Sequence, residues 1–353
     1  AFAFAQEGET AAPAATTADE INNAVTVRVP VSAKSIVTKD MAAYCAEAGI
    51  TIGAPTPKGA VYLQGVERVV ANVQDPNFTR SRVAAYSKAY QRAVAGYVLD
   101  KFGETAMESV DKYFSDASSN RLAPSQNVKD TLARIAEKTA QLTEAKLDEG
   151  LRAMGVTPAG SIVEKRALAA NSIVKSSLKK AIGEASGVLP VQTFEGWNEA
   201  GQYAVGVIAR GGIDTEEVAK ALRDKRIPLL QKPEAAITVA EATPTDEELV
   251  SQFGVRMFFD ESGIPSIISF GQWGSAYAGT DPDAEEDAMD HALEQAEMEA
   301  DDQLTAFKAH TNLNSPKEDS NNTRFIIMDY FREKDAAGIA VNPIIEGRVT
   351  VAE

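Results

Sequence analysis

The sequence is poor in the side chains from which metal and nucleophilic sites are built. It holds one cysteine, two histidines and two tryptophans among 353 residues. A zinc site or a Ser-His-Asp centre needs several such groups close together. His291 and His310 would lie about 28 Å apart on one straight helix, at about 1.5 Å per residue. We therefore expect no catalytic residue, no metal site and no cofactor, and we interpret both histidines as exposed helix residues.

The single cysteine, Cys45, excludes a disulfide within one chain. Its position and neighbours do not match a lipidation site near a chain start, so we expect a small, buried apolar residue. Long apolar runs are missing as well. No stretch approaches the roughly 20 apolar residues that cross a bilayer, and the sequence therefore predicts no membrane span.

Basic residues are outnumbered, with 35 Lys and Arg against 51 Asp and Glu, which gives a formal net charge of −16. Such a charge repels nucleic acid and anionic lipid and favours solubility. We therefore expect no nucleic-acid partner. Hydrophobic residues make up 44% of the chain and charged residues 24%, which is typical of a globular protein.

Sequence motifs for nucleotide binding and acyl transfer are also missing. There is no P-loop, G-x-G-x-x-G or G-x-S-x-G pattern, and Gly211-Gly212 is only a turn signal. Residues 172–175 and 176–179 both fit S-x-x-K, but the companion signatures of that enzyme class are absent. An amphipathic helix accounts for them better.

Two other features have both a functional and a structural interpretation. The acidic residues between Asp281 and Asp287 could hold calcium, but they lack the EF-hand glycine and glutamate spacing, and capping of a helix start explains them better. Trp197 and Trp273 lie beside strand ends, where we favour core packing over ligand contact. Acidic residues are numerous enough to supply the paired carboxylates of a glycoside hydrolase. Aromatic residues, which would form platforms for a sugar substrate, make up only 7% of the chain.

The clearest structural pattern spans residues 255–310. Two strand-like runs, 255–260 and 265–270, flank a turn, and a helix is predicted to begin at Asp281-Pro282. Alanine then recurs at every fourth position, which places small side chains along one narrow ridge and lets the helix lie close to a sheet. The ladder consists of Ala284, Ala288, Ala292, Ala296 and Ala300.

An earlier stretch repeats this order. Residues 61–71 predict a strand, and Asp75-Pro76 predicts the start of a helix that runs to about Phe102. Gly65 precedes Asp75 by ten residues, as Gly271 precedes Asp281. We interpret the match as an internal duplication. The first helix carries its own buried stripe of Ala85, Ala89, Ala93 and Tyr97.

The remaining sequence supplies shorter elements. Residues 128–154 and 161–185 predict a helical hairpin around a Gly/Pro breaker. Further predictions are strands at 25–31, 191–197 and 203–209, a short helix at 39–48, a helix at 214–224 with Asp214 as its N-cap, a polar connection at 231–246, a loop at 312–322 and a strand or helix at 325–333.

The chain start indicates export. Residues 1–6 resemble the end of a secretory signal, since Ala3-Phe4-Ala5 fits the small-x-small cleavage pattern, and residues 7–20 have the composition of a flexible leader. Alternatively, residues 1–5 begin the exported chain and form a short strand. Both alternatives place the protein outside the cytoplasm.

The glycine-bearing strands and alanine-rich helices resemble the LPP20/SIMPL-type exported domains of bacterial envelopes. The resemblance rests on Gly65 with Ala85, Ala89 and Ala93, on Gly196-Trp197 followed by residues 203–209, and on Gly271 with the 284–300 ladder, and it covers about half of the chain. It implies an envelope-associated α+β protein without a known catalytic site, and some members belong to flagellar outer-membrane rings. The lipid-bearing N-terminal cysteine of many members has no counterpart here.

We therefore expect an α+β fold in which duplicated strand-helix units, each a sheet packed by an Ala-rich helix, flank an inserted helical hairpin. The expected divisions are a leader or donor strand at 1–24, a first α/β unit at 25–125, the hairpin at 126–186, a strand pair with a helix at 187–245, and a second α/β unit at 246–353.

The expected function is that of an exported, non-enzymatic subunit that self-assembles into a filament, ring or envelope-associated array. The chain would form a homo-oligomer with a possible cell-envelope partner. The alternative is a periplasmic or outer-membrane-associated binding or scaffolding module, and a carboxylate-dependent hydrolase is a third class. Assembly would use exposed strands at both ends of the chain. Their predicted contact residues are Phe2, Phe4, Ile345, Val349 and Val351.

Overall fold

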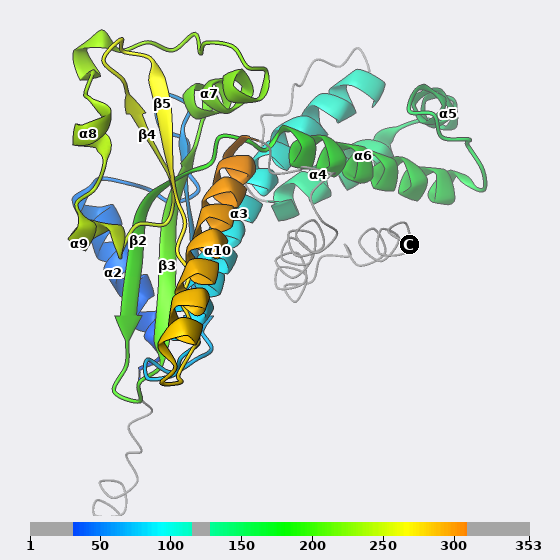
Figure 1. The fold of residues 1–353 in the computed structure, drawn as a ribbon. Coiled ribbons are helices and arrows are strands. Elements are labelled where there is room, and N and C mark those ends of the chain that lie inside the picture. Colours follow the sequence, from blue (N-terminus) through cyan, green and yellow to red (C-terminus); the bar gives the residue numbers. More distant parts are fainter. Residues whose placement is uncertain (1–30, 115–127, 309–353) are drawn as a thin grey trace, which may run out of the picture.

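The computed structural model describes residues 31–114 and 128–308. Within these ranges the chain combines antiparallel sheets with helices, which confirms the expected α+β class (Figure 1). The elements are α2 (Ala33–Glu47), β1 (Val61–Val69), α3 (Phe78–Phe114), α4 (Val128–Gln141), α5 (Glu144–Ala153), α6 (Ile162–Glu184), β2 (Leu189–Trp197), β3 (Tyr203–Gly211), α7 (Ile213–Arg223), η1 (Pro233–Ala235), α8 (Val239–Ala242), α9 (Asp246–Leu249), β4 (Gly254–Phe259), β5 (Pro265–Phe270) and α10 (Pro282–Lys308).

The larger sheet is covered by a helix on each face. Its strand order is β1-β3-β2, and β3 pairs antiparallel with both neighbours. Because successive side chains of a strand point to opposite faces, β3 contributes to two cores. Ala204 and Ile208 pack with α2, whereas Val205, Val207 and Ala209 join the cluster that contains α3. The central strand is therefore buried on both faces.

Helix α3 lies directly on β1. The expected stripe of Ala85, Ala89, Ala93 and Tyr97 is buried, and the small side chains bring the helix backbone close to the strand. A Cβ atom at Gly65 would overlap the carbonyl oxygen of Ala89. The contact between α3 and β1 therefore requires glycine at this position of the strand.

The β4–β5 hairpin and α10 repeat this arrangement. The Asp260 carboxylate accepts from the amides of Ser262 (2.9 Å) and Ile264 (3.0 Å), which fixes the hairpin turn. A Cβ atom at Gly271 would overlap the carbonyl oxygen of Ala296, the counterpart of the Gly65 contact. The two contacts are alike, as an internal duplication predicts. The alanines of the ladder are half-buried along α10.

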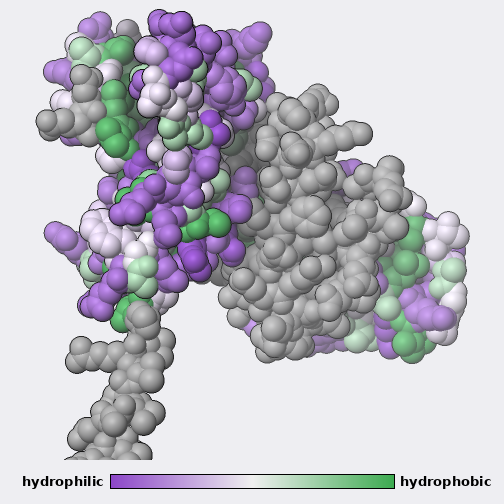
Figure 2. Space-filling view, turned by 60° about the horizontal axis from the view of Figure 1, so that its bottom comes forward, coloured by the Kyte–Doolittle hydropathy of each residue, from purple (hydrophilic) through white to green (hydrophobic). Residues whose placement is uncertain are grey.

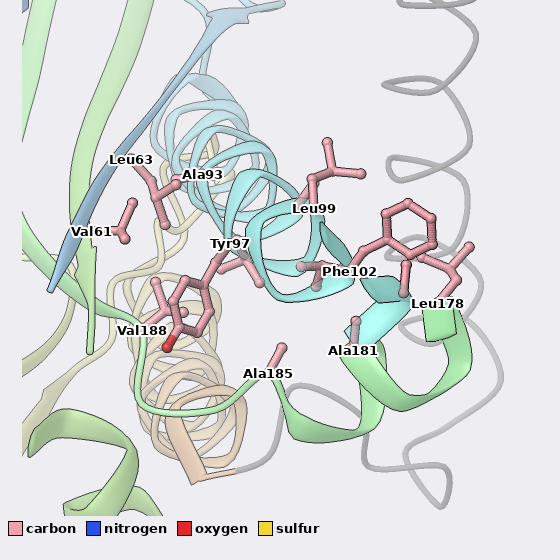
Figure 3. Close-up of a cluster of buried hydrophobic side chains, with 14 of the residues drawn as sticks. Val61, Leu63, Ala93, Tyr97, Leu99, Phe102, Leu178, Ala181, Ala185 and Val188 are labelled. Atoms are coloured by element: carbon pink, nitrogen blue, oxygen red, sulfur yellow. The ribbon is translucent and has the colours of Figure 1, made fainter. Parts of the chain in front are cut away.

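The second half of α3 extends beyond the sheet and forms a helical layer with α4, α5 and α6. Its Leu99 and Phe102 pack with Leu178 and Ala181 of α6 (Figure 3). The expected helical hairpin is present, but its first arm is divided into α4 and α5. The chain turns at Leu142, which is buried, and Thr143 adopts an extended conformation as the N-cap of α5.

Several predicted helix boundaries were wrong. Helix α3 begins at Phe78, because the Asp75 carboxylate accepts from the Asn77 amide (2.8 Å) in a turn before it, and it continues past Phe102 to Phe114. Helix α2 begins at Ala33, six residues earlier than predicted, after the N-cap Ser32. The polar connection at 231–246 contains η1 and α8 and reaches the start of α9.

The predicted N-cap of α7 was also wrong. The N-cap is Gly212, whose amide donates to the Thr215 hydroxyl (3.1 Å). Asp214 is instead paired with Arg210, whose Nη2 donates to both carboxylate oxygens (2.8 and 2.6 Å). The predicted strand at 25–31, apart from Val31, lies outside the described residues, as do the leader, the loop at 312–322 and the segment at 325–333.

The glycine contacts predict the behaviour of single substitutions. Gly65→Ala and Gly271→Ala should each lower the free energy of unfolding by more than about 3 kcal/mol, because the added methyl group meets main-chain atoms that cannot move away alone. Chemical denaturation followed by circular dichroism measures both. Gln64→Ala, at an exposed neighbouring position, is the control and should change stability little. A neutral Gly65→Ala would contradict the packing described here.

Candidate functional site

The histidines and acidic residues singled out in the sequence do not form a metal site in the described part of the chain. His291 is exposed on α10, and His310 lies outside the described residues. The Asp281 carboxylate accepts from the Asp283 amide (3.1 Å), which agrees with the capping interpretation. Across residues 31–114 and 128–308, no group of His, Cys, Asp and Glu side chains is arranged to hold a metal ion.

The other candidate residues have structural surroundings. Cys45 is buried on the sheet-facing side of α2, as expected. The S-x-x-K serines lie on α6, where the Ser176 hydroxyl donates to the Ile173 carbonyl (3.1 Å). Trp273 is partly buried against the main core. Core packing was the wrong interpretation for Trp197, which is 66% exposed at the end of β2 and stacks on Tyr203 with ring centroids 6.1 Å apart.

One surface hollow of about 300 Å³ lies beside the start of β1. Its only charged lining residues are Lys58 and Arg210, and the Arg210 guanidinium is already paired with Asp214. The lining contains no nucleophile next to a general base, so the hollow gives no basis for a reaction. Its other lining residues are Thr56, Pro57, Ala60 and Tyr62.

A buried arginine joins the two sheet units. Arg82 of α3 donates from Nε (2.5 Å) and Nη2 (2.8 Å) to the two carboxylate oxygens of Glu195 on β2. It also donates to the side-chain oxygen of Gln272 (2.8 Å) and to the Val250 carbonyl (3.0 Å). Its guanidinium lies 4.6 Å from the centre of the Phe253 ring. Each donor is directed at a structural partner, so this arginine connects elements and is not presented to a ligand.

A second polar cluster lies where α3 passes α7. Lys101 forms an ion pair with Glu216 (2.9 Å), and Glu216 also accepts a hydrogen bond from the Tyr97 hydroxyl. Burial raises the pKa of Tyr97. Burial also raises the pKa of Asp100 to about 6, with a further increase from Glu104 and an opposing effect of Lys101. A carboxylate held in such surroundings destabilises the fold when it is ionised.

This cluster predicts a pH-dependent effect of Asp100→Asn. Because the folded-state pKa of Asp100 lies above the ordinary value of 3.8, its stabilising contribution is complete below about pH 4 and is lost as the pH rises through about 6. The variant should match the parent near pH 3.5 and exceed it by about 1 kcal/mol at pH 8, after allowance for solvent screening.

Denaturation curves at the two pH values measure this difference. Asp40→Asn, on the exposed side of α2, is the matched control. An equal effect of Asp100→Asn at both pH values would contradict the environment assigned to Asp100.

The candidate interaction site is the outer edge of β1. This strand is terminal in the sheet order, with β3 on its inner side, and isolated bridges from Ile52 and Pro55 cover only its first two residues. The Tyr62 carbonyl points outward, since it accepts from the Gly53 amide (2.8 Å). Main-chain groups alternate in direction along an antiparallel strand, so those of Gln64, Val66 and Arg68 point outward as well.

These outward groups form an open edge within the described part of the chain. No hydrogen bond from residues 31–114 or 128–308 reaches the main chain of Gln64 or Val66. The Arg68 amide donates to the Glu67 carboxylate of its own strand (3.2 Å). Gln64 and Arg68 are exposed, so the edge is accessible. Unpaired edges of this kind are templates for an added strand.

The sequence predicted exposed strands but not this edge. The five predicted assembly residues, Phe2, Phe4, Ile345, Val349 and Val351, all lie outside the described residues. The structure therefore does not bring them to β1 or separate them from it. In the sequence, the polar residues Gln64 and Arg68 within the strand pattern were the only signal for this edge. They do not identify it, because the strands that pair with β1 depend on the topology of the whole sheet.

Comparisons with known proteins add a partial match. A family profile described as Domain of unknown function (DUF6844) matches residues 132–224, which run from α4 through α7 and make up well under half of the chain. A comparison with curated protein sequences finds no match. A crystal structure of hypothetical protein FTT1539c from Francisella tularensis is similar, with 20% identity and a TM-score of 0.48, over 90% of this chain and 83% of that one.

None of the helices at 31–114 and 128–308 combines the length and the apolar character that a transmembrane helix requires.

Proposed function

We propose that this protein is an exported, non-enzymatic structural subunit that self-assembles into an extracellular filament, a ring or an envelope-associated array. The observation that supports this proposal is the open edge of β1, whose main-chain groups at Gln64 and Val66 point outward. A strand from a second copy satisfies them by main-chain hydrogen bonds. No ligand is needed for such an assembly.

The proposed donor strand is the start of the chain. The open edge at residues 64–68 is about 17 Å long at about 3.4 Å per residue, the length of an extended strand formed by residues 1–5. In that strand Phe2 and Phe4 lie on one face, where they contact apolar side chains beside β1. The C-terminal run with Ile345, Val349 and Val351 is a second predicted strand, which we propose can also extend the sheet.

The N-terminal segment joins the fold at Val31, and its length allows donation to another copy. Val31 is held at the end of the β2–β3 hairpin, where its carbonyl accepts from the Asn198 side-chain amide (3.1 Å). The thirty residues before it can extend to roughly 100 Å at about 3.3 Å per residue. A donor and an acceptor at different places on one molecule make a head-to-tail contact, which produces filaments or closed rings.

Deletion of residues 1–20 should yield folded monomers at micromolar concentration. The reason is that the deletion removes the donor strand but leaves every described element intact. Light scattering gives the molar mass, and circular dichroism reports the fold. A full-length chain that stays monomeric at high concentration, including in calcium-containing, high-salt buffer, would contradict the proposal and favour a monomeric periplasmic binding or scaffolding module.

Gln64→Pro tests the acceptor edge. Proline removes the outward N–H of Gln64 without removing a hydrogen bond to β3, and edge strands tolerate proline at such positions. The apparent Kd of association should rise at least about tenfold, which corresponds to about 1.4 kcal/mol. Gln64→Thr, which keeps the N–H, is the matched control and should assemble like the parent. Equal assembly of the two variants would exclude this edge.

A further inference from the structure

The segment after α7 presents two apolar side chains on a fixed loop. Lys225 has a φ of 54°, the left-handed conformation in which helices commonly end with glycine. The Lys225 amide donates to the Leu222 carbonyl (3.3 Å), and the Arg226 amide donates to the Ala221 carbonyl (3.0 Å). These hydrogen bonds terminate the helix. The direction in which the chain leaves α7 is therefore set by main-chain hydrogen bonds.

Glu217 holds the next residues in place. Its carboxylate accepts from two nitrogens of Arg226 (2.6 and 2.9 Å) and from the Leu229 amide (3.1 Å). The hydrogen bond from Arg226 is the main reason that the pKa of Glu217 falls to about 2. Pro228 is buried, whereas Ile227 on one side of it is 64% exposed and Leu229 on the other is 83% exposed. Both aliphatic side chains are thus held outward.

Exposed cations precede these side chains in the sequence. Lys220, Arg223 and Lys225 are all exposed, and Asp224 is the one acidic residue in the stretch 220–229. We call this stretch the basic loop. Its charge is opposite to the net charge of −16 on the chain. Aliphatic and cationic side chains on one rigid loop fit an acidic surface that has apolar side chains of its own.

Such a surface lies on the first half of α10. Met289 and Leu293 are each 61% exposed, and Glu286, Asp290 and Glu297 are exposed on the same side of the helix at spacings of three and four residues. Every formally charged residue from 283 to 302 is acidic. We call residues 286–297 of this side the acidic strip. Figure 2 shows a mainly hydrophilic face on which hydrophobic residues occupy small, separate areas.

The two surfaces lie at opposite ends of one molecule. The sheet contacts of α10 are made by its second half, through Ala296, Ala300 and Phe307. The first half extends away from the β4–β5 hairpin. In Figure 1 α7 and the loop after it are at the top, and α10 starts at the bottom. The basic loop therefore lies at the C-terminal end of α10, separated along the helix from the acidic strip of its own copy.

We propose that the basic loop of one copy docks on the acidic strip of the next copy, in a head-to-tail contact. The inference rests on the proposed self-assembly and adds a second contact to strand addition at β1. Ile227 and Leu229 meet Met289 and Leu293, and the loop cations face the carboxylates of the strip. A second copy is favoured over a lipid bilayer, because the net charge of −16 repels anionic lipid while the strip supplies matching charge.

The test exchanges charge between the two surfaces of the full chain. One variant carries Lys220→Glu with Lys225→Glu, and the other carries Asp290→Lys with Glu297→Lys. Each variant alone has two surfaces of like charge, so its apparent Kd of association should rise at least about tenfold. An equimolar mixture pairs opposite charges again and should restore the Kd of the parent to within about threefold. Sedimentation equilibrium measures all three samples.

The controls separate this contact from general charge effects. Lys175→Glu with Lys179→Glu changes the net charge equally on the exposed side of α6 and should leave the Kd unchanged. Ile227→Ser with Leu229→Ser should weaken association, whereas Val163→Ser, at another exposed position, should not. Circular dichroism of every variant checks the fold. Two variants that dissociate singly but fail to associate when mixed would overturn the proposal.

Three further results would also overturn it. Vesicles of phosphatidylcholine and phosphatidylglycerol that bind the parent and the α10 variant, but not the Lys220→Glu, Lys225→Glu variant, would assign the loop to a membrane surface. Charge variants that assemble normally while Gln64→Pro does not would remove the loop contact and leave the proposed function standing. A parent chain that is monomeric would contradict both the loop contact and the proposed self-assembly.

Discussion

Two helices approach their sheets so closely that a glycine is required at one position under each helix, and the rest of the described architecture depends on this contact. At Gly65 the carbonyl oxygen of Ala89 occupies the space of a Cβ atom, and at Gly271 the carbonyl oxygen of Ala296 does the same. Small residues along α3 and α10 permit the approach. Because α3 is held to β1 in this way, its second half projects beyond the sheet, and α4 to α6 pack on it. The strand that carries this contact, β1, is also one of the two edge strands of its sheet.

Much of this architecture follows from local sequence patterns. Strands β1, β3, β4 and β5, the helical hairpin and the buried stripe that includes Ala89 were all predictable, because alternation and fourfold spacing report one buried face. The matching positions of Gly65 and Gly271 indicate a repeat from the sequence alone, and the structure adds the carbonyl contact of each glycine. Local patterns gave the wrong N-cap for α7, since Arg210 engages Asp214. They also gave the wrong environment for Trp197, whose exposure depends on which elements cover the end of β2.

The candidate site was less predictable than the fold, because an open sheet edge is a property of topology. Nothing within residues 61–69 says that β3 lies on one side of β1 and that no strand from the described residues lies on the other. The basic loop was missed for a related reason. The sequence alone does not distinguish Ile227 and Leu229 from buried apolar residues. Only the hydrogen bonds of Glu217 and the burial of Pro228 show that their side chains are held outward. For both features we propose contacts between molecules.

Our central proposal is that an added strand forms hydrogen bonds with the outward main-chain groups of β1 when the protein assembles. Residue-resolved amide hydrogen exchange of the full chain, compared between dilute monomer and concentrated assembly, tests it most directly. The account predicts that the outward amides of Gln64 and Val66 exchange at least about tenfold more slowly in the assembly, since each gains a main-chain hydrogen bond. Unchanged exchange at both amides in a sample that light scattering shows to be assembled would contradict it.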